Sequence, residues 1–377
     1  MTVLTINTGS SSVRLAVFSL EGKSLALRAS GHFPNTQGDP EEILRTFLQG
    51  YSAEKVAVVA HRIVHGGSRL KAPCWLDDEV ETEIRRLVPL APLHNPLALR
   101  WVAACRAVFG KQIGQMAVFD TAFYATLPEV AATYALPQAI CRKHDIRRYG
   151  FHGLAHQAMW RRWRKLRPEI REGGRVISLQ LGAGCSITAI RDGQAVDTSM
   201  GFSPLEGLVM ATRSGDLDPG LLLYLLREGR MTVDKLERLL NQDSGLRGMA
   251  GENDMRKLLA SNEPSAQLAI DIYCYRVRKY IGAYLAVLGG ADAILFGGGV
   301  GEHAPEIRER ILAGMEWAGI VLDRERNRAA IGSEACLSQD DSPVAIWTIA
   351  VDEAQLLAEE AASLLTQPIK NNREKQS

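Results

Sequence analysis

Three short glycine-rich segments are the parts of this sequence best suited to hold a charged ligand. They are Thr8–Ser12, Gly182–Ser186 and Gly297–Gly301, and each follows an apolar run of strand length. Small residues let backbone N–H groups approach an anion closely, and phosphate is the natural candidate. None matches the dinucleotide-binding or P-loop pattern, and each alone is more often a plain tight turn. Three of them together favour one polyphosphate held by two halves of an α/β fold.

Polar side chains in apolar or turn-rich surroundings form a second group of candidates. They are His61, Arg62, His94, Asp120, His152, Arg213 and Asp216. α/β folds bind ligands at the carboxyl ends of strands and on the loops that follow. Plainer interpretations stay open: hydrogen-bonded structural histidines at 61 and 65, salt bridges for the arginines, and a helix cap for Asp120. Asp216 and Asp218, just before Pro219, are interpreted as turn and capping residues without chemistry.

The elements that must position these residues alternate between strands and helices. Three strands at residues 3–7, 13–18 and 24–30 precede predicted helices at 77–87 and 96–109 and strands at 55–61 and 115–119. The order strand, glycine turn, strand, hairpin, strand recurs at residues 175–198. Later segments predict helices at 265–288, 305–317 and 353–365, strands at 293–296 and 344–349, and a frayed tail from residue 370. We therefore expect an α/β protein whose architecture is duplicated.

Composition narrows the class of protein. The 377 residues favour two domains, and 44 basic against 43 acidic residues leave a net charge of +1. This balance excludes the basic surface of a nucleic-acid binder or a polybasic membrane surface. The six cysteines lack zinc-ligand spacing, and the longest apolar stretch, residues 283–300, contains Asp292 and several glycines. With no signal-peptide pattern in its first residues, the sequence predicts no membrane span, no nucleic-acid partner and a cytoplasmic location.

Nine ordered segments carry a resemblance to a known family. They are Asn7–Ser12, His61–Gly67, Ala91–Pro96, Val118–Phe123, Arg148–Gly153, Asp197–Gly201, Pro204–Gly207, Thr212–Pro219 and Asp352–Glu353. Together they resemble the acetate kinases, of the acetate and sugar kinase, Hsp70 and actin superfamily, over nearly the whole chain. The resemblance implies two α/β domains of duplicated ribonuclease H-like topology with an interdomain active-site cleft. The implied domains are residues 1–124 with 355–377, and residues 125–354 for nucleotide binding and dimerisation.

The resemblance also implies a reaction and the residues that perform it. The reaction is reversible transfer of the ATP γ-phosphoryl group to acetate, giving acetyl phosphate and ADP, in a homodimer that uses Mg²⁺, with Mn²⁺ as an alternative. Arg62 and Arg213 would bind the carboxylate and the transferring phosphoryl group, because a planar guanidinium matches two oxygens. His152 would donate to a phosphoryl oxygen, with His94 in support. Asp120 would orient Arg62 or the metal shell.

Further site residues follow from the same resemblance. Asn7 and Glu353 would hold the metal directly or through water. A small apolar pocket for the acyl group would consist of Val64, Leu93, Phe151 and Pro204. ATP or ADP would be bound by Arg14, Gly182, Gly184, Asp254, Met255, Arg256, Gly297, Gly298, Gly299 and Gly301. Four apolar side chains cannot separate acetate from propionate, since one methylene is worth only ~1–3 kcal/mol.

The sequence departs from the family pattern beside the predicted phosphate site. Gln180 and Ala183 replace the His and Asn of the family's His-Leu-Gly-Asn-Gly segment, and His303 replaces an Asn. Leu154 and Ala155 replace Thr-Ser, and Arg14 replaces Lys. These changes bear on donor preference and turnover. A kinase for propionate or butyrate, another phosphoryl donor, and a non-catalytic nucleotide-binding protein remain as alternatives.

Overall fold

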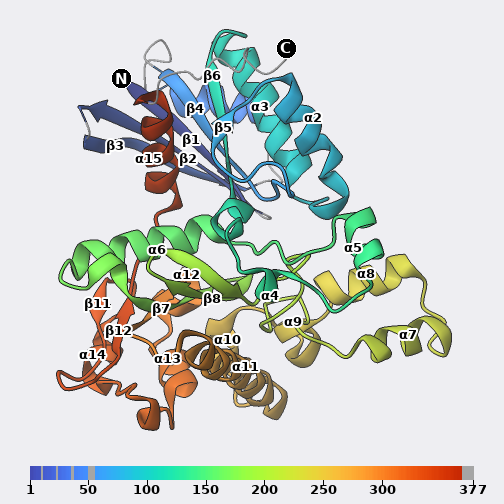
Figure 1. Ribbon diagram of the computed structural model, residues 1–377, viewed down its shortest axis with the longest axis vertical. Helices are drawn as coiled ribbons and strands as arrows, with labels where there is room; N and C mark the ends of the chain where they lie inside the picture. The colour runs from blue at the N-terminus through green and yellow to red at the C-terminus, as the bar shows by residue number, and fades with distance from the viewer. Residues whose placement is uncertain (10–11, 23, 35–37, 50–55, 367–377) are drawn as a thin grey trace. The chain divides into compact units, whose positions relative to one another are not determined.

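The computed structural model describes residues 1–9, 12–22, 24–34, 38–49 and 56–366. Two residues of the predicted turn at 8–12, the first residue of the strand predicted at 55–61, and the tail beyond 366 lie outside the described residues. The chain divides into two compact units, residues 1–122 with 352–377, and residues 123–351. Figure 1 shows the elements of each unit.

The first unit is built on a six-stranded mixed sheet in the order β3-β2-β1-β4-β6-β5. Its strands are β1 (Thr2–Thr8), β2 (Ser12–Glu21), β3 (Ser24–Pro34), β4 (Val56–Ile63), β5 (Cys74–Trp75) and β6 (Gly114–Phe119). β1 is antiparallel to β2 and parallel to β4, and β4 is parallel to β6. All seven residues of β1 are buried, because helices cover both faces of the sheet.

Two groups of helices provide that cover. The helices are α1 (Pro40–Leu48), α2 (Asp78–Arg86), α3 (Asn95–Phe109) and α15 (Glu353–Thr366), with 3₁₀ turns η2 (Val88–Leu90) and η3 (Asp120–Tyr124). Leu4 and Ile6 of β1 pack with Leu44 of α1 and Trp101 of α3. α15 packs on β1, β2 and β4. Since strand side chains alternate between faces, Asn7 lies on the opposite face from Ile6, beside α15.

The second unit repeats this strand order. Its sheet runs β11-β12-β10-β7-β8-β9. The strands are β7 (Arg175–Leu181), β8 (Cys185–Arg191), β9 (Gln194–Thr198), β10 (Ala293–Gly297), β11 (Ala335–Cys336) and β12 (Ala345–Thr348). In both sheets three antiparallel strands, consecutive in the chain, are followed across the sheet by two parallel strands, so the predicted duplication of architecture is confirmed.

The second unit contains eleven helices among the described residues, and some of them pack on its sheet. They are α4 (Glu129–Ala132), α5 (Gln138–His144), α6 (Gly153–Leu166), α7 (Pro219–Arg227), α8 (Val233–Gln242), α9 (Gly245–Ala250), α10 (Met255–Leu259), α11 (Pro264–Leu288), α12 (Gly298–His303), α13 (Pro305–Leu312) and α14 (Arg324–Ala329), with 3₁₀ turns η4 (Arg171–Gly173) and η5 (Glu316–Ala318). α6 packs on β7 and β10, and α11 packs on β7 and β8. Met159 and Trp163 of α6 join the buried core. None of the helices in the described part of the chain is long and apolar enough to cross a membrane.

The structure corrects several predicted elements. The segment predicted as a turn at 297–301 begins the short helix α12, whose first N–H, from Gly298, is bonded to the Glu302 side chain. The helix predicted at 305–317 ends at Leu312, two residues before Gly314, which has φ +74°. α6 was missed by the sequence argument, although its buried residues Ala155, Met159 and Trp163 recur every four positions. Its start lacks a capping Ser, Thr, Asp or Asn.

Candidate functional site

In the first unit, four predicted site residues form one polar cluster. Arg62 on β4 donates from Nε and Nη2 to the carboxylate of Asp120, with an Nη2–Oδ2 distance of 2.7 Å. Its Nη1 donates to Oδ1 of Asn7 at 3.1 Å and lies 3.7 Å from Oε2 of Glu353. Asn7 closes the cluster by donating to the same Glu353 oxygen at 2.6 Å. The structure therefore gathers residues that span almost the whole sequence.

Sheet topology explains this convergence. β1, β4 and β6 are mutually parallel, so their carboxyl ends lie at one edge of the sheet. Asn7 is near the end of β1, Arg62 is near the end of β4, and Asp120 follows β6 directly. Glu353 is the first residue of α15, which packs on β1 and β4. Strand alternation turns Arg62 toward α15, whereas its neighbour His61 faces α3 and contacts Gln115 at 2.7 Å.

The cluster is largely buried, so its charges interact more strongly than they would in water. The side chains of Arg62 and Asp120 are 11% and 1% exposed. Burial alone would lower the pKa of the Arg62 guanidinium, but Asp120 and Glu353 raise it by more, so this pKa lies above its ordinary value. Arg62 is thus a permanent cation with two carboxylates near it. Asp120 acts on Arg62 and is not a free base.

A second group of predicted site residues meets in the second unit. His152 directly precedes α6 and has the left-handed backbone angles φ 56° and ψ 26°, which are uncommon for a residue with a side chain. Its ring lies beside the turn between β7 and β8. A Cβ added to Gly184 would be 3.2 Å and 3.3 Å from Cε1 and Nε2 of His152, and 3.6 Å from Nη1 of Arg213. An imidazole, a guanidinium and a bare glycine backbone therefore line one small region.

Arg213 differs from Arg62 in its partners, which in the described part of its own unit include no acidic side chain. Its Nη1 donates to the backbone oxygen of Pro204 at 3.0 Å and contacts Sδ of Met210 at 3.6 Å. Among the described residues of this unit, no carboxylate lies within ion-pair distance of it. Burial lowers its pKa, with a small opposing effect of Cys185. A half-buried guanidinium without a counter-ion is a place where an anionic ligand gains electrostatic energy.

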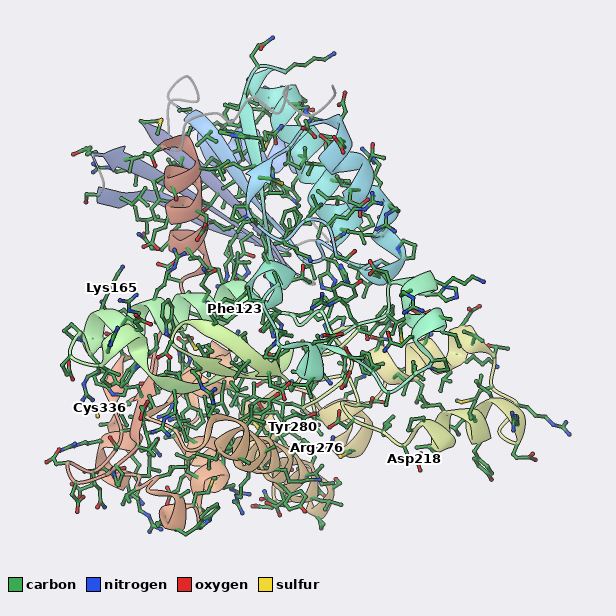
Figure 2. The ribbon with its side chains drawn as sticks, viewed as in Figure 1. Phe123, Lys165, Asp218, Arg276, Tyr280 and Cys336 are labelled. Atoms are coloured by element: carbon green, nitrogen blue, oxygen red, sulfur yellow. The ribbon has the colours of Figure 1, made fainter. Side chains whose placement is uncertain are left out.

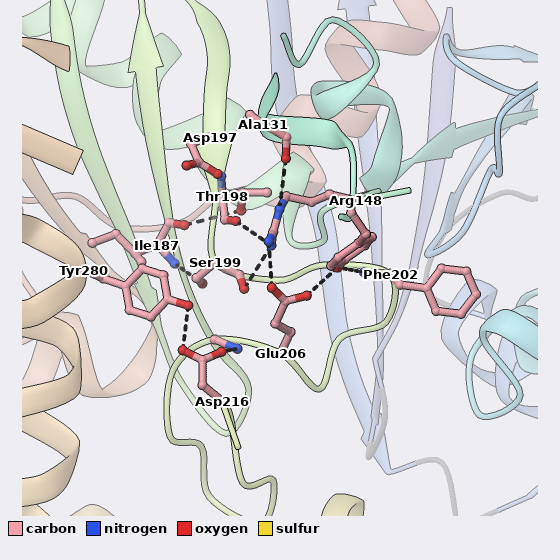
Figure 3. A network of polar contacts seen from close by, with 12 residues as sticks. Ala131, Arg148, Ile187, Asp197, Thr198, Ser199, Phe202, Glu206, Asp216 and Tyr280 are labelled. Carbon is pink, nitrogen blue, oxygen red and sulfur yellow. Dashed lines mark hydrogen bonds and ion pairs between the residues drawn. The ribbon is translucent and has the colours of Figure 1, made fainter. Parts of the chain in front are cut away.

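The loop that carries Pro204 and Arg213 is held by a polar network (Figure 3). Glu206 accepts hydrogen bonds from Arg148 at 2.6 Å and from the hydroxyl of Tyr134. Asp216 accepts from the backbone N–H of Gly207 at 2.7 Å and from the hydroxyl of Tyr280 at 2.8 Å. Asp216 therefore has a structural role here, joining two parts of the loop to α11 and not only to a local turn.

Other side chains around this loop serve structure. Asp218 caps α7 by accepting from the N–H of Gly220 at 2.8 Å, so its predicted capping role is confirmed. Figure 2 marks Asp218 at the start of α7 and Arg276 with Tyr280 on α11. Arg276 lies 3.3 Å from Asp216 and binds the Gly207 carbonyl at 3.2 Å. The ends of the loop are therefore anchored to two helices.

The predicted nucleotide residues fall in separate places. Asp254 caps α10 and forms an exposed salt bridge with Arg256 at 2.5 Å, which together with the Arg256 N–H lowers the Asp254 pKa to about 2. Met255 between them is buried. Gly182 and Gly184 form the β7–β8 turn, whereas Gly297–Gly301 runs from β10 into α12. Arg14 pairs in register with Asn7 of the first unit.

The residues predicted for the acyl pocket differ in exposure. Val64 and Phe151 are 5% and 1% exposed, so both sit in apolar cores. Leu93 is 60% exposed, and the neighbouring His94 stands just before α3. Pro204 contributes its carbonyl to Arg213. Within each unit, these positions lie on or beside segments that also carry the polar candidates.

Sequence reasoning missed several residues that support the candidates. Ser186 and His156 contact one another beside His152, at 2.8 Å between Oγ and Nε2. The buried Arg308 donates to the carbonyls of Gly301 and Glu302, at the end of α12. The spacing of His152 and His156, one helical turn apart, was a usable signal for the first pair. No sequence pattern indicates the role of Arg308, because it joins these carbonyls to Asn327 and Ala330, which are 19 and 22 residues away.

The repeated strand order in two six-stranded sheets belongs to the duplicated α/β fold of solved acetate kinase structures. A model of the acetokinase family matches residues 33–359, and the chain belongs to this family. It is 48% identical over 318 residues to an acetate kinase of Chloroherpeton thalassium, covering 82% of this chain and 76% of that one. It is 41% identical over 394 residues to an acetate kinase of Streptomyces avermitilis, covering 96% and 97%.

Solved structures agree with this assignment. An acetate kinase of Porphyromonas gingivalis, 34% identical, superposes with a TM-score of 0.87 over 97% of this chain and 99% of that one. A propionate kinase of Francisella tularensis, also 34% identical, gives 0.86 over 95% and 98%. The predicted family and fold class are therefore confirmed.

Proposed function

We propose that this protein catalyses the reversible transfer of the γ-phosphoryl group of ATP to acetate, giving acetyl phosphate and ADP. Membership of the acetokinase family supports the class of reaction. The observation that carries the proposal is Arg213, a half-buried guanidinium without an acidic partner in its unit, beside His152 and the Gly184 turn. This arrangement suits a transferring phosphoryl group better than a structural ion pair.

The residues have roles that fit this chemistry. The attacking acetate oxygen carries no proton, so no general base is needed, and the protein must mainly position two anions and offset their charge. Arg213 binds the transferring group, and His152 donates a hydrogen bond to one of its oxygens. Arg62 is oriented by Asp120, and it binds acetate or the phosphoryl oxygens with the N–H groups that are not bonded to Asp120 or Asn7. His94 has a supporting role in binding the transferring phosphoryl group.

The Arg62 cluster also fits a magnesium ion. Its acceptors are the carboxylates of Asp120 and Glu353 and the amide oxygen of Asn7, and oxygen ligands are those that Mg²⁺ prefers. Arg62 already engages Asp120 and Asn7, so we propose that Glu353 and Asn7 hold the hydrated ion largely through water. When bound, the ion supplies positive charge to the phosphate oxygens; Mn²⁺ is the alternative.

For the nucleotide, we propose the glycine segments at 182–184 and 297–301, together with Arg14 and Asp254–Arg256. Gln180, which replaces a histidine of the family pattern, lies beside these glycine segments. Its side chain lies against Gly298, with 3.0 Å from Nε2 to the position of a Cβ on that glycine. Donor preference is therefore the property most open to change by this chain's departures from the family pattern.

Propionate is a second candidate substrate, because a propionate kinase superposes as well as an acetate kinase does. We propose Val64, Leu93, Phe151 and Pro204 as the acyl-contacting residues. A hydroxylamine trap of the acyl phosphate tests both proposals, with acetate, propionate and butyrate against ATP and pyrophosphate. Acetyl hydroxamate formed from ATP supports the acetate kinase assignment. Nucleotide binding without any acyl hydroxamate would favour a non-catalytic protein and contradict the assignment.

We propose that the two units are the family's acetate and nucleotide-binding domains, and that the second also forms a homodimer. α7 supports the dimer, since none of its residues is buried although it contains five leucines and one tyrosine. Leu221, Leu223 and Tyr224 are 43%, 52% and 60% exposed. Exposed apolar surface of this kind marks association sites. Sedimentation equilibrium should give a dimer for the wild type and a shift toward monomer for Leu223→Glu with Tyr224→Glu.

A further inference from the structure

A buried arginine on α13 holds the end of the preceding helix, α12. Arg308 has no exposed surface, and its Nη1 donates to the carbonyls of Gly301 at 2.8 Å and Glu302 at 3.1 Å. Its Nε donates to Oδ1 of Asn327 at 2.8 Å. Its Nη2 donates to the carbonyls of Asn327 at 2.9 Å and Ala330 at 2.7 Å. A guanidinium carries five N–H groups, so all of them are used.

No acidic side chain pairs with Arg308 in the described part of this unit. Its acceptors are four backbone carbonyls and one side-chain amide. The carbonyls belong to the ends of α12 and α14, where a helix has partial negative charge that favours a cation. Burial lowers the pKa of Arg308 to about 10, so the group is a cation at neutral pH. A full positive charge therefore lies beside the last turn of α12.

A second arginine of this unit shows what the capping of a helix end requires. Arg278 of α11 donates to the carbonyl of Ile311 at 2.9 Å and to that of Arg310, at the end of α13. Arg278 is partly buried, and its Nε and Nη2 make these bonds. Capping thus requires neither complete burial nor five donors. Arg308 differs because it joins two helix ends at once, and one of them belongs to a candidate ligand site.

The helix end that Arg308 holds is part of the glycine segment proposed above for the nucleotide. Four of the five residues at 297–301 are glycine, which is among the least favourable residues in a helix. Contacts from outside the segment must therefore keep it helical. At one end, Oε1 of Glu302 accepts from the N–H of Gly298 at 2.9 Å. At the other end, Arg308 and the N–H of Gly332, which bonds to the Glu302 carbonyl at 3.0 Å, hold the backbone.

The same segment is open to ligands on one side. Gly299 is exposed, and a Cβ added there would meet no atom within 4 Å. Gly298 and Gly301 are buried, and Arg308 binds the segment at Gly301. A polyphosphate that reaches the backbone at Gly299 therefore lies within two residues of the carbonyl that the buried cation binds. Charges interact more strongly near the protein interior than in water, so this cation favours binding.

We propose that Arg308 and Asn327 are positioning residues for the nucleotide, which keep the segment 297–301 helical and place an unneutralised positive charge beside it. This role rests on the proposed function for the identity of the ligand, whereas the contacts that hold the segment are independent of it. Two effects follow. Loss of the five hydrogen bonds should loosen the segment, and loss of the net charge should weaken binding in proportion to the negative charge of the ligand.

Replacements at Arg308 separate the two effects. Lysine keeps the charge but has only three donors, whereas glutamine loses the charge as well. Isothermal titration calorimetry of the full-length protein measures the Kd for ATP, ADP and AMP, without added Mg²⁺ so that ligand charge decreases in that order. We expect the Kd for ATP to rise about 10-fold in Arg308→Lys, because small displacements of binding groups are costly, and about 100-fold in Arg308→Gln. The rise in Arg308→Gln should be largest for ATP and smallest for AMP.

Asn327→Asp tests the charge while Arg308 stays in place. The substitution keeps Oδ1 as an acceptor for Nε of Arg308 and adds a carboxylate beside the guanidinium. We expect the Kd for ATP to rise about 10-fold and the Kd for AMP to rise less. The substitution also removes the bond from Nδ2 to the carbonyl of Pro305, at 2.9 Å. Asn327→Leu removes that bond without adding charge, so it should weaken ATP and AMP binding equally.

Amide hydrogen exchange measures directly how firmly the segment is held. In Arg308→Lys we expect the N–H groups of α12 to exchange at least about 10-fold faster than in the wild type, because local opening of the helix becomes easier. Arg278→Lys is the matched control, since it loses bonds to the end of α13. It should leave both the exchange in α12 and the Kd for ATP unchanged.

The outcomes separate this role from the proposed reaction. A Kd for ATP that is unchanged in Arg308→Gln and Asn327→Asp would overturn the proposal, and so would equal losses for ATP and AMP in Asn327→Asp. If the Arg308 variants do not fold, Asn327→Asp and Asn327→Leu give the same decision. A wild type that binds ATP but forms no acetyl hydroxamate contradicts the proposed function and leaves the binding test valid. A wild type that forms acetyl hydroxamate from ATP, with variants of wild-type affinity, contradicts the positioning role alone.

Discussion

At the scale of single residues, the two arginines are not equivalent. Arg62 is engaged by Asp120 and lies near Glu353, so its charge is largely offset within the protein. Within the described residues of its unit, Arg213 contacts a backbone carbonyl and a sulfur atom and no carboxylate, and it lies beside the Gly184 turn. A dianionic phosphoryl group therefore gains more from Arg213, whereas Arg62 contributes through an orientation that its neighbours fix.

Replacing Arg213 by alanine should remove activity without unfolding the protein. We expect kcat to fall by on the order of 10³ or more, by analogy with arginines that stabilise phosphoryl transfer. The free energy of unfolding should change little, because no buried carboxylate loses its partner. Hydroxamate formation and urea unfolding measure the two effects, with the exposed Arg28→Ala as control. Full activity in Arg213→Ala would contradict the assigned role.

Replacing Asp120 by asparagine should instead damage both stability and activity. Among the described residues of the unit, the substitution leaves buried Arg62 with Glu353 as its remaining nearby carboxylate, and breaking a buried ion pair costs ~3–5 kcal/mol. Urea unfolding of Asp120→Asn against wild type measures this loss. Glu41→Gln, which disrupts an exposed ion pair with Arg45, should cost under ~1 kcal/mol and serves as control. Equal losses of unfolding free energy in both variants would show that the buried ion pair contributes no more to stability than the exposed one.

At the scale of elements, the β7–β8 turn decides how closely ligands can approach. Gly184 presents bare backbone between His152 and Arg213, and Gly182 donates its N–H to the Gly184 carbonyl at 3.1 Å. α6 supplies His152 from one side, and the loop held by Glu206 and Asp216 supplies Arg213 from the other. The turn is therefore the point where three segments meet.

Adding a methyl group at this turn should impair function selectively. In Gly184→Ala the new Cβ would lie 3.2 Å from Cε1 of His152, closer than most contacts of this kind, so the ring must shift. We expect kcat to fall about 10-fold or more, since small misplacements of catalytic groups are costly. Gly282→Ala, where nothing lies near the new Cβ, is the control. Unchanged kinetics in Gly184→Ala would argue against a site at the turn.

At the scale of the whole molecule, each unit contains a buried histidine whose pKa is lowered by burial, His61 in the first unit and His156 in the second. Burial lowers the pKa of His61 to about 4, although the hydrogen bond that His61 donates to Gln115 opposes this, and burial lowers the pKa of His156 to about 3. In the unfolded chain both titrate near 6.5. As the pH falls below that value, the unfolded state binds protons that the folded state does not bind. Stability must therefore decline on acidification in both units.

Acid unfolding should show this linkage. Between pH 7.5 and pH 5, each histidine should lower the free energy of unfolding by about 2 kcal/mol. Urea unfolding of His61→Gln should show a decline smaller by that amount, even though the variant is less stable at pH 7.5. His32→Gln, at an exposed position, should retain the wild-type decline. An identical pH dependence in His61→Gln and wild type would contradict the buried neutral state.

Much of the fold and many candidate residues could be predicted from local sequence. The three antiparallel strands that include each of the first two glycine turns, the long helix α11 and the repeated strand order follow from apolar periodicity and turn residues. Asn7, Arg62, Asp120 and Glu353 were singled out by type and resemblance, and the structure gathers them. α6 was missed because its start has no capping side chain; its first residues depend on the left-handed backbone of His152.

The sequence by itself determined which residue types were present and in what order, because helical and strand periods are local properties of the chain. Tertiary structure alone decided that Asp120 belongs to Arg62, that Arg213 has no acidic partner in its unit, and that Ser186 and His156 stand behind His152. These relations depend on sheet register and helix packing across long sequence separations. Hydrogen-bond partners that are distant in the sequence leave no local sequence pattern. Any donor or acceptor of suitable size that packs at the same place could form the same hydrogen bond.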